Sequence, residues 1–347
     1  MPAPSPPHLT APFTALSAAH AQQLLEQVYG LEVRALHRLP TERDDTFRVR
    51  TDDATLVAKL AHPLDDPRVL HDQLAVLERL AREHPDLPVQ RIVPARDGAL
   101  LTPVEAADDR PRLLRVLTYL EGEPLGAAPR SLAALGELGA LHARLATAIA
   151  TIGDAAEPPL QGAPTPWNLL SADQYAPLLD QVADDDLRRA ARRVIDRARD
   201  AVLPRALALP ALLAHNDLHG DNVLVRAEPF AITGVLDFGD MTRTPRVADL
   251  AVAASYARGR VGEAGAPWAA AAAYVAGFER EQPLTDEEHA LLPELVLLRL
   301  AQRGILNTAI AAANPAAAPY ASRNLRAIER DLRELGASIP SRIGAPE

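Results

Sequence analysis

The chain has 347 residues, a length that accommodates two domains or one two-lobed domain. Its formal net charge of −10 disfavours a general nucleic-acid binder, and the absence of cysteine excludes disulfides and thiolate zinc sites. The N-terminus has no basic segment before an apolar stretch, and glycine and proline interrupt the Ala-rich stretch at 264–278. We therefore expect a soluble, cytoplasmic protein without a membrane partner.

The first 120 residues are predicted to form a mostly antiparallel sheet with one inserted helix. Residues 1–16 are rich in proline and are expected to be disordered. A helix is predicted from Ser17, a good N-cap, to Tyr29, with Gly30 as its stop. Apolar spacing predicts a second helix over 67–84. Strands are predicted over 31–39, 46–51, 54–60, 90–95, 99–104 and 113–120.

The pattern becomes helical after Gly122. Helices are predicted over 131–152, over 185–203 and from Arg246 to the C-terminus, with short strands over 222–226 and 232–236. The fold class is therefore α+β, with an N-terminal lobe over 17–120 and a C-terminal lobe over 121–347. A cleft between two lobes is the expected ligand site.

The strongest chemical signal is H-N-D-L-H-G-D-N at residues 215–222, followed by Asp237 in D-F-G-D. Phosphoryl transfer needs a carboxylate that orients the attacking hydroxyl and accepts its proton. It also needs oxygen ligands that hold Mg²⁺ against the triphosphate. Asp217 is the predicted base, and Asn222 and Asp237 are the predicted magnesium ligands.

This H-x-D-x-x-x-x-N pattern with a following D-F-G resembles the aminoglycoside phosphotransferase and choline kinase-like branch of the protein-kinase fold. The resemblance implies a two-lobed protein in which a small antiparallel-sheet lobe binds ATP or GTP and a large helical lobe carries catalysis. It implies Asp217 as catalytic base, Asn222 and Asp237 as metal ligands and His215 as the histidine that braces the catalytic loop. A zinc site of His215, Asp217 and His219 is an alternative that explains fewer of these residues.

Lys59 follows an apolar run in the third predicted strand. A lysine that faces inward there neutralises the α- and β-phosphates, whereas a solvated edge-strand lysine is the alternative. In related kinases a glutamate on the next helix holds this lysine. The best-matching position here is Gln73, and the nearest acid, Glu78, lies on a different helical face.

The loop over 39–47 contains no glycine, so it is not a Gly-rich phosphate loop. Thr41, Arg43 and Thr46 are candidate phosphate contacts, and a polar hairpin is the alternative. Residues 118–121 resemble the hinge between lobes, and the backbone at Thr118 and Leu120 is predicted to meet the purine. Backbone contacts do not distinguish ATP from GTP.

Two segments are similar to the hydroxylysine kinase-like proteins: L-P-T-E-R-D-D-T-F-R-V at 39–49 and D-F-G-D-M-T-R-T-P at 237–245. The similarity implies an acceptor hydroxyl on an amino alcohol or a hydroxy amino acid. The chain departs from that branch at Thr46, where the branch usually has asparagine, and at Asn168, where it tends to have an acid.

Such an acceptor carries an amine that acidic or aromatic side chains bind, and in some cases a carboxylate that arginine binds. Asp249 is predicted to brace the catalytic loop. The alternatives are a choline-, homoserine- or aminoglycoside-type kinase and a nucleotide-binding pseudokinase without turnover. The candidate acceptor contacts are Trp167, Asp240, Tyr256, Arg299 and Arg303.

Overall fold

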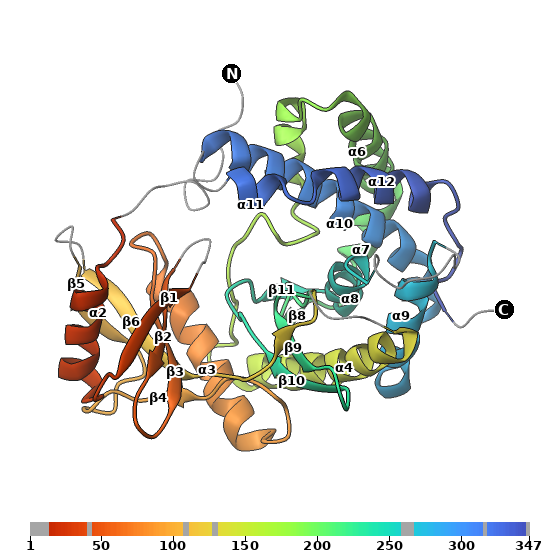
Figure 1. The fold of residues 1–347 in the computed structure, drawn as a ribbon. Helices are drawn as coiled ribbons and strands as arrows, with labels where there is room; N and C mark the ends of the chain where they lie inside the picture. The colour runs from red at the N-terminus through yellow and green to blue at the C-terminus, as the bar shows by residue number, and fades with distance from the viewer. Residues whose placement is uncertain are drawn as a thin grey trace. The chain divides into compact units, whose positions relative to one another are not determined.

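The computed structural model describes residues 14–39, 44–106, 111–126, 131–257, 267–314 and 318–344. Its internal contacts divide the chain into one compact unit over Pro7–Glu121 and a second that consists mainly of Gly122–Glu347. The N-terminal unit runs from red to yellow in Figure 1, and the C-terminal unit runs from yellow-green to blue.

The N-terminal unit opens with the predicted helix, formed by α2 (Ala18–Leu24) and the π-helical segment η1 (Leu25–Tyr29). The Ser17 hydroxyl accepts the backbone N–H of His20, and Gly30 ends the helix with a φ of +71°. Residues 1–13 of the segment expected to be disordered lie outside the described residues. The expectation is wrong at Leu16, which is buried and donates its backbone N–H to Asp45.

Six antiparallel strands form one sheet in the order β1-β2-β3-β6-β4, with β5 also beside β6. Helix α3 (Pro67–Glu83) is inserted after β3, as predicted. The first strand begins later than predicted, because Leu31 and Val33 pack against the core before strand pairing starts. The strands are β1 (Ala35–Leu39), β2 (Asp45–Arg50), β3 (Thr55–Leu60), β4 (Ile92–Val93), β5 (Thr102–Glu105) and β6 (Pro111–Thr118).

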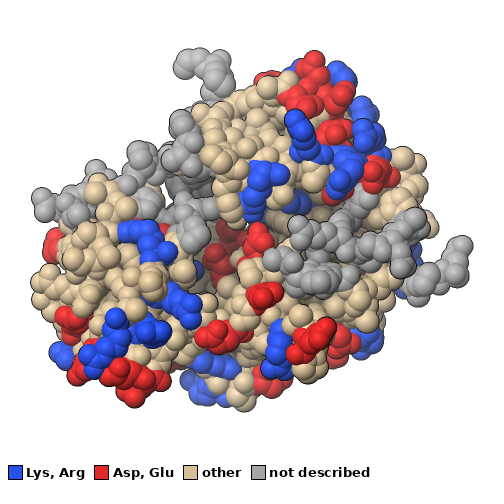
Figure 2. Space-filling view, viewed as in Figure 1, with Lys and Arg blue, Asp and Glu red and all other residues tan. Residues whose placement is uncertain are grey.

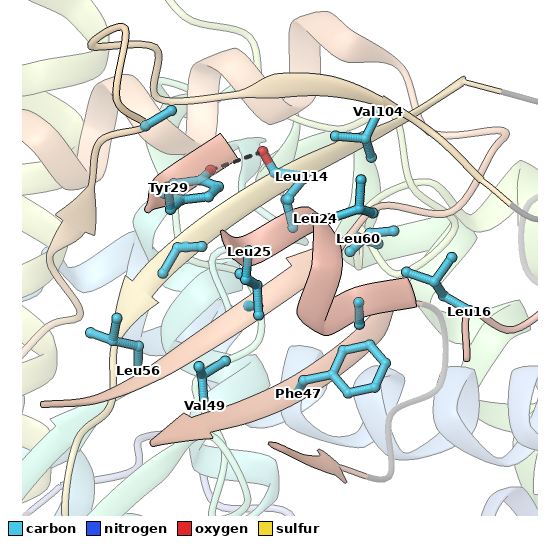
Figure 3. Packing of buried hydrophobic residues seen from close by; sticks show 14 residues of the cluster. Leu16, Leu24, Leu25, Tyr29, Phe47, Val49, Leu56, Leu60, Val104 and Leu114 are labelled. Carbon is cyan, nitrogen blue, oxygen red and sulfur yellow. Dashed lines mark hydrogen bonds between the residues drawn. The ribbon is translucent and has the colours of Figure 1, made fainter. Parts of the chain in front are cut away.

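One face of this sheet forms the hydrophobic core with α2 and η1 (Figure 3). Phe47, Ala58 and Val116 are paired across β2, β3 and β6 and all belong to this core. Tyr29 closes one end by donating its hydroxyl to the carbonyl of Leu114 at 3.4 Å. Because side chains alternate along a strand, the neighbouring positions point to the opposite face of the sheet.

A buried ion pair lies at the edge of this core. The Nη1 atom of Arg112 is 2.7 Å from the Asp45 carboxylate, and both side chains are almost fully enclosed. Arg112 also donates to the carbonyls of Ala61 and Leu60. Asp45 additionally accepts the backbone N–H of Leu16, so the pair joins β2, β6 and the segment that precedes α2.

The C-terminal unit is built around helices α4 (Leu132–Ala155), α9 (Ala269–Glu281) and α10 (Asp286–Ala313). Helices α4 and α9 approach closely at glycines: a Cβ at Gly139 would lie 2.0 Å from the Tyr274 carbonyl oxygen. Helices α4 and α10 are long and apolar enough to cross a membrane, but 67% and 72% of their most apolar windows are buried inside the protein. Burial of this kind is typical of core helices.

The remaining helices surround this core. The exposed face of α6 carries Arg and Asp residues side by side, which is typical of a solvated helix (Figure 2). The helices are α5 (Ala172–Tyr175), η2 (Ala176–Gln181), α6 (Asp185–Arg197), η3 (Ala198–Val202), α7 (Leu203–Ala206), α8 (Arg246–Ser255), α11 (Ala318–Ser322) and α12 (Leu325–Gly336).

Two small sheets hold the loops that carry the chemical motifs. One has the order β10-β9-β7, and the other pairs β11 with β8. Residues 215–222 connect β8 to β9, and residues 236–241 connect β10 to β11. The sequence predicted β9 and β10 but not the others, which are too short to show a period. The strands are β7 (Glu123–Pro124), β8 (Leu212–Ala214), β9 (Val223–Arg226), β10 (Ala231–Val235) and β11 (Thr242–Thr244).

Candidate active site

Asp249 on α8 holds the loop between β8 and β9 in place through a hydrogen bond. Asn216 has a φ of +63°, a left-handed conformation that asparagine tolerates better than most residues. Its backbone N–H donates to Asp249 Oδ1 at 2.7 Å. His142 on α4 donates from Nε2 to Asp249 Oδ2 at 2.8 Å, and Tyr274 donates its hydroxyl to His142 Nδ1 at 3.0 Å. A buried chain of hydrogen bonds thus fixes the turn that precedes Asp217, as the bracing role predicted for Asp249 requires.

His215 is a buried support of the same loop. Its Nδ1 accepts the backbone N–H of Asp217 at 3.3 Å, so its proton is on Nε2, which donates to the Leu236 carbonyl at 3.1 Å. Burial lowers the pKa of His215 and keeps the ring neutral. The ring also packs edge-on against Phe238. With both nitrogens engaged, His215 links the two motif loops and does not fit the alternative zinc site.

The Asp217 carboxylate is held by three side chains. Asn222 Nδ2 donates to Oδ2 at 2.8 Å, Arg299 Nη2 lies 3.3 Å from Oδ1, and His219 Nε2 lies 3.3 Å from Oδ2. Burial acts to raise the pKa of Asp217, but the charges of His219 and Arg299 and the hydrogen bond from His219 outweigh it and lower the pKa. The carboxylate is therefore ionised and fixed in direction, which suits a group that accepts a proton from a hydroxyl.

Asn222 and Asp237 are brought together by the β9–β10 hairpin. The backbone N–H of Leu236 donates to the Asn222 carbonyl at 2.8 Å, and Asp237 follows with a φ of +57°. Left-handed backbone at a non-glycine residue is a feature of functional loops. Since Asn222 Nδ2 donates to Asp217, its Oδ1 is the atom that remains for a cation.

The donor set fits a hard divalent cation. Within the described ranges no three or more His, Cys, Asp or Glu side chains cluster in a way that could hold a metal. An amide oxygen from Asn222 and a carboxylate from Asp237 match Mg²⁺, which takes few protein ligands and completes its shell with phosphate oxygens and water. These two residues would hold the ion that the sequence predicts.

Arg299 does not have the role predicted from the sequence. It is 1% exposed, and its Nη1 donates to the Trp167 carbonyl at 3.0 Å and to Gln302 Oε1 at 2.7 Å. Its other terminal nitrogen faces Asp217. The guanidinium is therefore committed to the protein and is not available for a bidentate contact with an acceptor carboxylate. It links α10 to the Trp167 loop and to the base.

The other candidate acceptor contacts fall into two groups. The Tyr256 ring stacks on His219 with centroids 4.7 Å apart, and the Arg303 guanidinium lies 3.7 Å from the centre of the same ring. Asp240 accepts a long hydrogen bond from Thr165, the residue whose hydroxyl also accepts the Trp167 N–H. His219 thus connects the stacked side chains of Tyr256 and Arg303 to Asp217. Thr165 connects Asp240 to the loop that contains Trp167.

In the N-terminal unit, Lys59 lies in a row of polar side chains. Thr46 on β2 and Arg115 on β6 are its direct cross-strand partners, so all three point to the face opposite the core. Lys59 has no hydrogen bond or ion pair with any residue that the structure describes. Thr46 Oγ1 and Arg115 Nη1 are also buried without a partner in the described parts of the chain. Because those two atoms are enclosed, the partly exposed Lys59 is the cation of this row that reaches a phosphate most directly.

The sequence left open whether Gln73 or Glu78 is the partner of Lys59. Glu78 is exposed on α3, and Gln73 is buried there. Asp44, next to β2, is instead 2.7 Å from Arg115. The predicted contacts Thr41 and Arg43 lie outside the described residues.

Thr118 and Leu120, both in the predicted hinge, differ in whether their backbone groups have hydrogen-bond partners. Thr118 donates its N–H to the Arg91 carbonyl, accepts Gln90 Nε2 on its own carbonyl, and accepts the Arg91 N–H on its hydroxyl. Each of its polar groups thus has a partner within the N-terminal unit, and the contact predicted between Thr118 and the purine stays a prediction. Leu120 keeps both backbone groups without a partner among the described residues.

Three contributors were missed or undervalued by the sequence analysis. His142 has no local signal, because Asp249 and Tyr274 are distant in sequence. Arg115 was visible as a cation in a predicted strand, but the register that places it beside Lys59 was not. His219 is named from the sequence only in the alternative zinc site, but in the structure it contacts Asp217.

Comparisons with known proteins identify a family and several relatives of this chain. A model of a family described as "Phosphotransferase enzyme family" matches residues 36–284. Hydroxylysine kinase of Danio rerio is 26% identical over 302 residues, which are 84% of this chain and 83% of that protein. Homoserine kinase of Rhodospirillum rubrum is 33% identical over 248 residues, 70% of this chain and 68% of that protein.

The fold is also similar to that of a solved structure of a microcompartment-associated aminopropanol kinase. The TM-score is 0.67 at 21% identity, with 93% of this chain and 100% of that chain covered. The protein-kinase-like fold predicted from the sequence is confirmed. The chain belongs to the phosphotransferase enzyme family and is a small-molecule kinase that acts on hydroxyl groups.

Proposed function

We propose that the protein transfers the γ-phosphate of ATP or GTP, with Mg²⁺, to a hydroxyl group of an amino alcohol or a hydroxy amino acid. The observation that carries this proposal is the Asp217 carboxylate, held ionised between Asn222, Arg299 and His219. The similarity to hydroxylysine kinase and homoserine kinase supports the acceptor class.

Asp217 performs the proton chemistry. It accepts a hydrogen bond from the acceptor hydroxyl and directs the oxygen at the γ-phosphorus. The new bond between oxygen and phosphorus forms as the bond from that phosphorus to the β–γ bridging oxygen breaks. The hydroxyl proton passes to Asp217, and the nucleoside diphosphate leaves. Arg299 and Asn222 keep the carboxylate aimed during this step.

In the N-terminal unit, Lys59 binds phosphate oxygens through the polar face of the sheet, and Leu120 meets the purine through its backbone. Asn222 and Asp237 would hold Mg²⁺, which would supply neutralisation of charge on the phosphates.

Two alternatives remain distinct from this proposal. A nucleotide-binding pseudokinase would bind the triphosphate and phosphorylate no acceptor; the intact set of Asp217, Asn222 and Asp237 argues against it. A choline- or aminoglycoside-type kinase would prefer acceptors that carry a cation and no carboxylate.

An acceptor panel tests the proposal. Homoserine, 5-hydroxylysine, 3-aminopropan-1-ol, choline and an aminoglycoside are each incubated with ATP or GTP, and phosphate esters are detected by ³¹P NMR. We expect an ester on a hydroxy amino acid or an amino alcohol, with Mg²⁺ and not with EDTA. Nucleotide binding without any ester would support the pseudokinase, and an ester on choline or the aminoglycoside alone would support the other alternative.

A further inference from the structure

Arg303 is a cation near the base, and no acid in the described part of the chain makes a hydrogen bond with it. It lies on α10 one turn after Arg299 and is only 8% exposed. Its guanidinium stacks on Tyr256 and makes no hydrogen bond with the residues that the structure describes. Buried arginines are normally paired, so five N–H donors in this position are an unusual feature that needs a ligand.

The neighbouring acids do not satisfy Arg303. Asp217 is taken by Asn222, Arg299 and His219. Asp331 on α12 attracts Arg303 electrostatically, but the structure shows no hydrogen bond or ion pair between the two side chains. Among the described residues, the guanidinium therefore has acids near it but none bonded to it.

The groups around the base carry charges of both signs. Arg299 pairs with Asp217, and Asp237 and Asp331 also act electrostatically on this cluster. Burial and the charge of Arg299 act to lower the pKa of Arg303, and Tyr256, Asp217 and Asp331 act to raise it. Burial acts to raise the pKa of Tyr256, but Arg303 and Arg299 lower it.

The geometry keeps Arg303 ready for a planar anion. The stack on Tyr256 fixes the plane of the guanidinium while leaving its N–H groups free at the edge. The fully enclosed polar atoms without a partner include Arg299 Nε but no atom of Arg303. The guanidinium of Arg303 therefore reaches accessible space, whereas that of Arg299 does not.

We propose that Arg303 binds the carboxylate of the phosphate acceptor, so that the preferred acceptor is a hydroxy amino acid and not an amino alcohol. This inference rests on the proposed function and narrows its acceptor class. The stack of His219, Tyr256 and Arg303 spans from the base to the carboxylate subsite. An acceptor whose hydroxyl meets Asp217 places its carboxylate on the Arg303 edge. A phosphate of the nucleotide is the other anion that an arginine here would bind, and the test separates the two.

The test uses acceptor pairs that differ only by the carboxylate. These are homoserine with 3-aminopropan-1-ol and 5-hydroxylysine with 1,5-diaminopentan-2-ol. Steady-state kcat/KM is measured for wild type, Arg303→Met and Arg303→Lys, together with AMP-PNP affinity. Arg323→Met is the matched control, because Arg323 also stacks on a tyrosine, Tyr320, and lies in the same unit.

In wild type we expect the amino acid of at least one pair to be preferred about 10- to 100-fold, the usual contribution of a charge-assisted hydrogen-bonded pair. Arg303→Met should remove that preference by lowering kcat/KM for the amino acid only. Arg303→Lys should restore part of it, and Arg323→Met should change neither. Thermal melting and unchanged turnover of the amino alcohol show that the variant is folded.

The possible outcomes distinguish a failure of the Arg303 inference from a failure of the proposed function. Equal losses for both members of a pair, with weaker AMP-PNP binding, would assign Arg303 to a nucleotide phosphate and overturn the inference. A wild-type preference for the amino alcohol, or a preference that survives in Arg303→Met, would also overturn it while leaving the proposed function intact. Failure of wild type to phosphorylate any of the four acceptors would overturn both.

Discussion

Replacement of Asp217 by asparagine is expected to lower kcat by about 10²- to 10⁴-fold, the usual contribution of a positioned general base. Asparagine has nearly the same shape and still offers an oxygen to Arg299, but it cannot take the proton of the acceptor hydroxyl. Asp217 contacts neither the nucleotide nor the cation in this mechanism but accepts a hydrogen bond from Asn222, so the affinity for AMP-PNP with Mg²⁺ should fall far less than kcat. Steady-state kinetics and calorimetry measure the two quantities separately.

Asp221→Asn is the matched control for this substitution. Asp221 lies in the same loop, but its side chain is 52% exposed and pairs only weakly with Arg323 at the surface. We expect its kcat to remain within about twofold of wild type, because exposed pairs contribute little. Comparable losses in both variants would mean that the loop needs its overall charge and that Asp217 has no special role.

Replacement of Asp45 by alanine is expected to lower the free energy of unfolding of the N-terminal unit by about 3–5 kcal/mol. The change leaves the guanidinium of Arg112 buried without its carboxylate, and it also removes the acceptor for the Leu16 N–H. An unpaired buried charge is far more costly than the loss of the pair as a whole. Urea unfolding followed by circular dichroism measures the effect.

Two further variants make this prediction specific. Asp52→Ala removes an exposed carboxylate that pairs with Arg34, and it should leave the unfolding midpoint unchanged. The double variant Asp45→Ala with Arg112→Met should be more stable than Asp45→Ala alone, because the stranded charge is gone. A single variant as stable as the Asp52 control would show that the buried pair does not hold this edge of the core.

Local patterns predicted the elements and the loops that carry chemistry. Ser17 and Gly30 bound the first helix because capping depends on neighbouring residues alone. The motif at 215–222 identified Asp217 and Asn222 because their contact is five residues apart and closes within one loop. Each of these features is encoded over a short stretch.

The roles of the arginines were not predictable in the same way. Arg299 and Arg303 share one helix face, and the sequence offered both for a carboxylate. Only the packed structure distinguishes them: Arg299 meets the Trp167 carbonyl and Asp217, whereas Arg303 meets Tyr256. Likewise, the pairing of Lys59 with Arg115 depends on strand register across 56 residues, which no local pattern specifies.

The central claim, that Asn222 and Asp237 hold a cation against a triphosphate, is tested most directly by calorimetric titration of AMP-PNP with Mg²⁺ and with EDTA. Wild type should bind more tightly with Mg²⁺, and Asp237→Asn should lose that difference while its affinity in EDTA stays the same. A magnesium-dependent gain of equal size in wild type and Asp237→Asn would contradict the account.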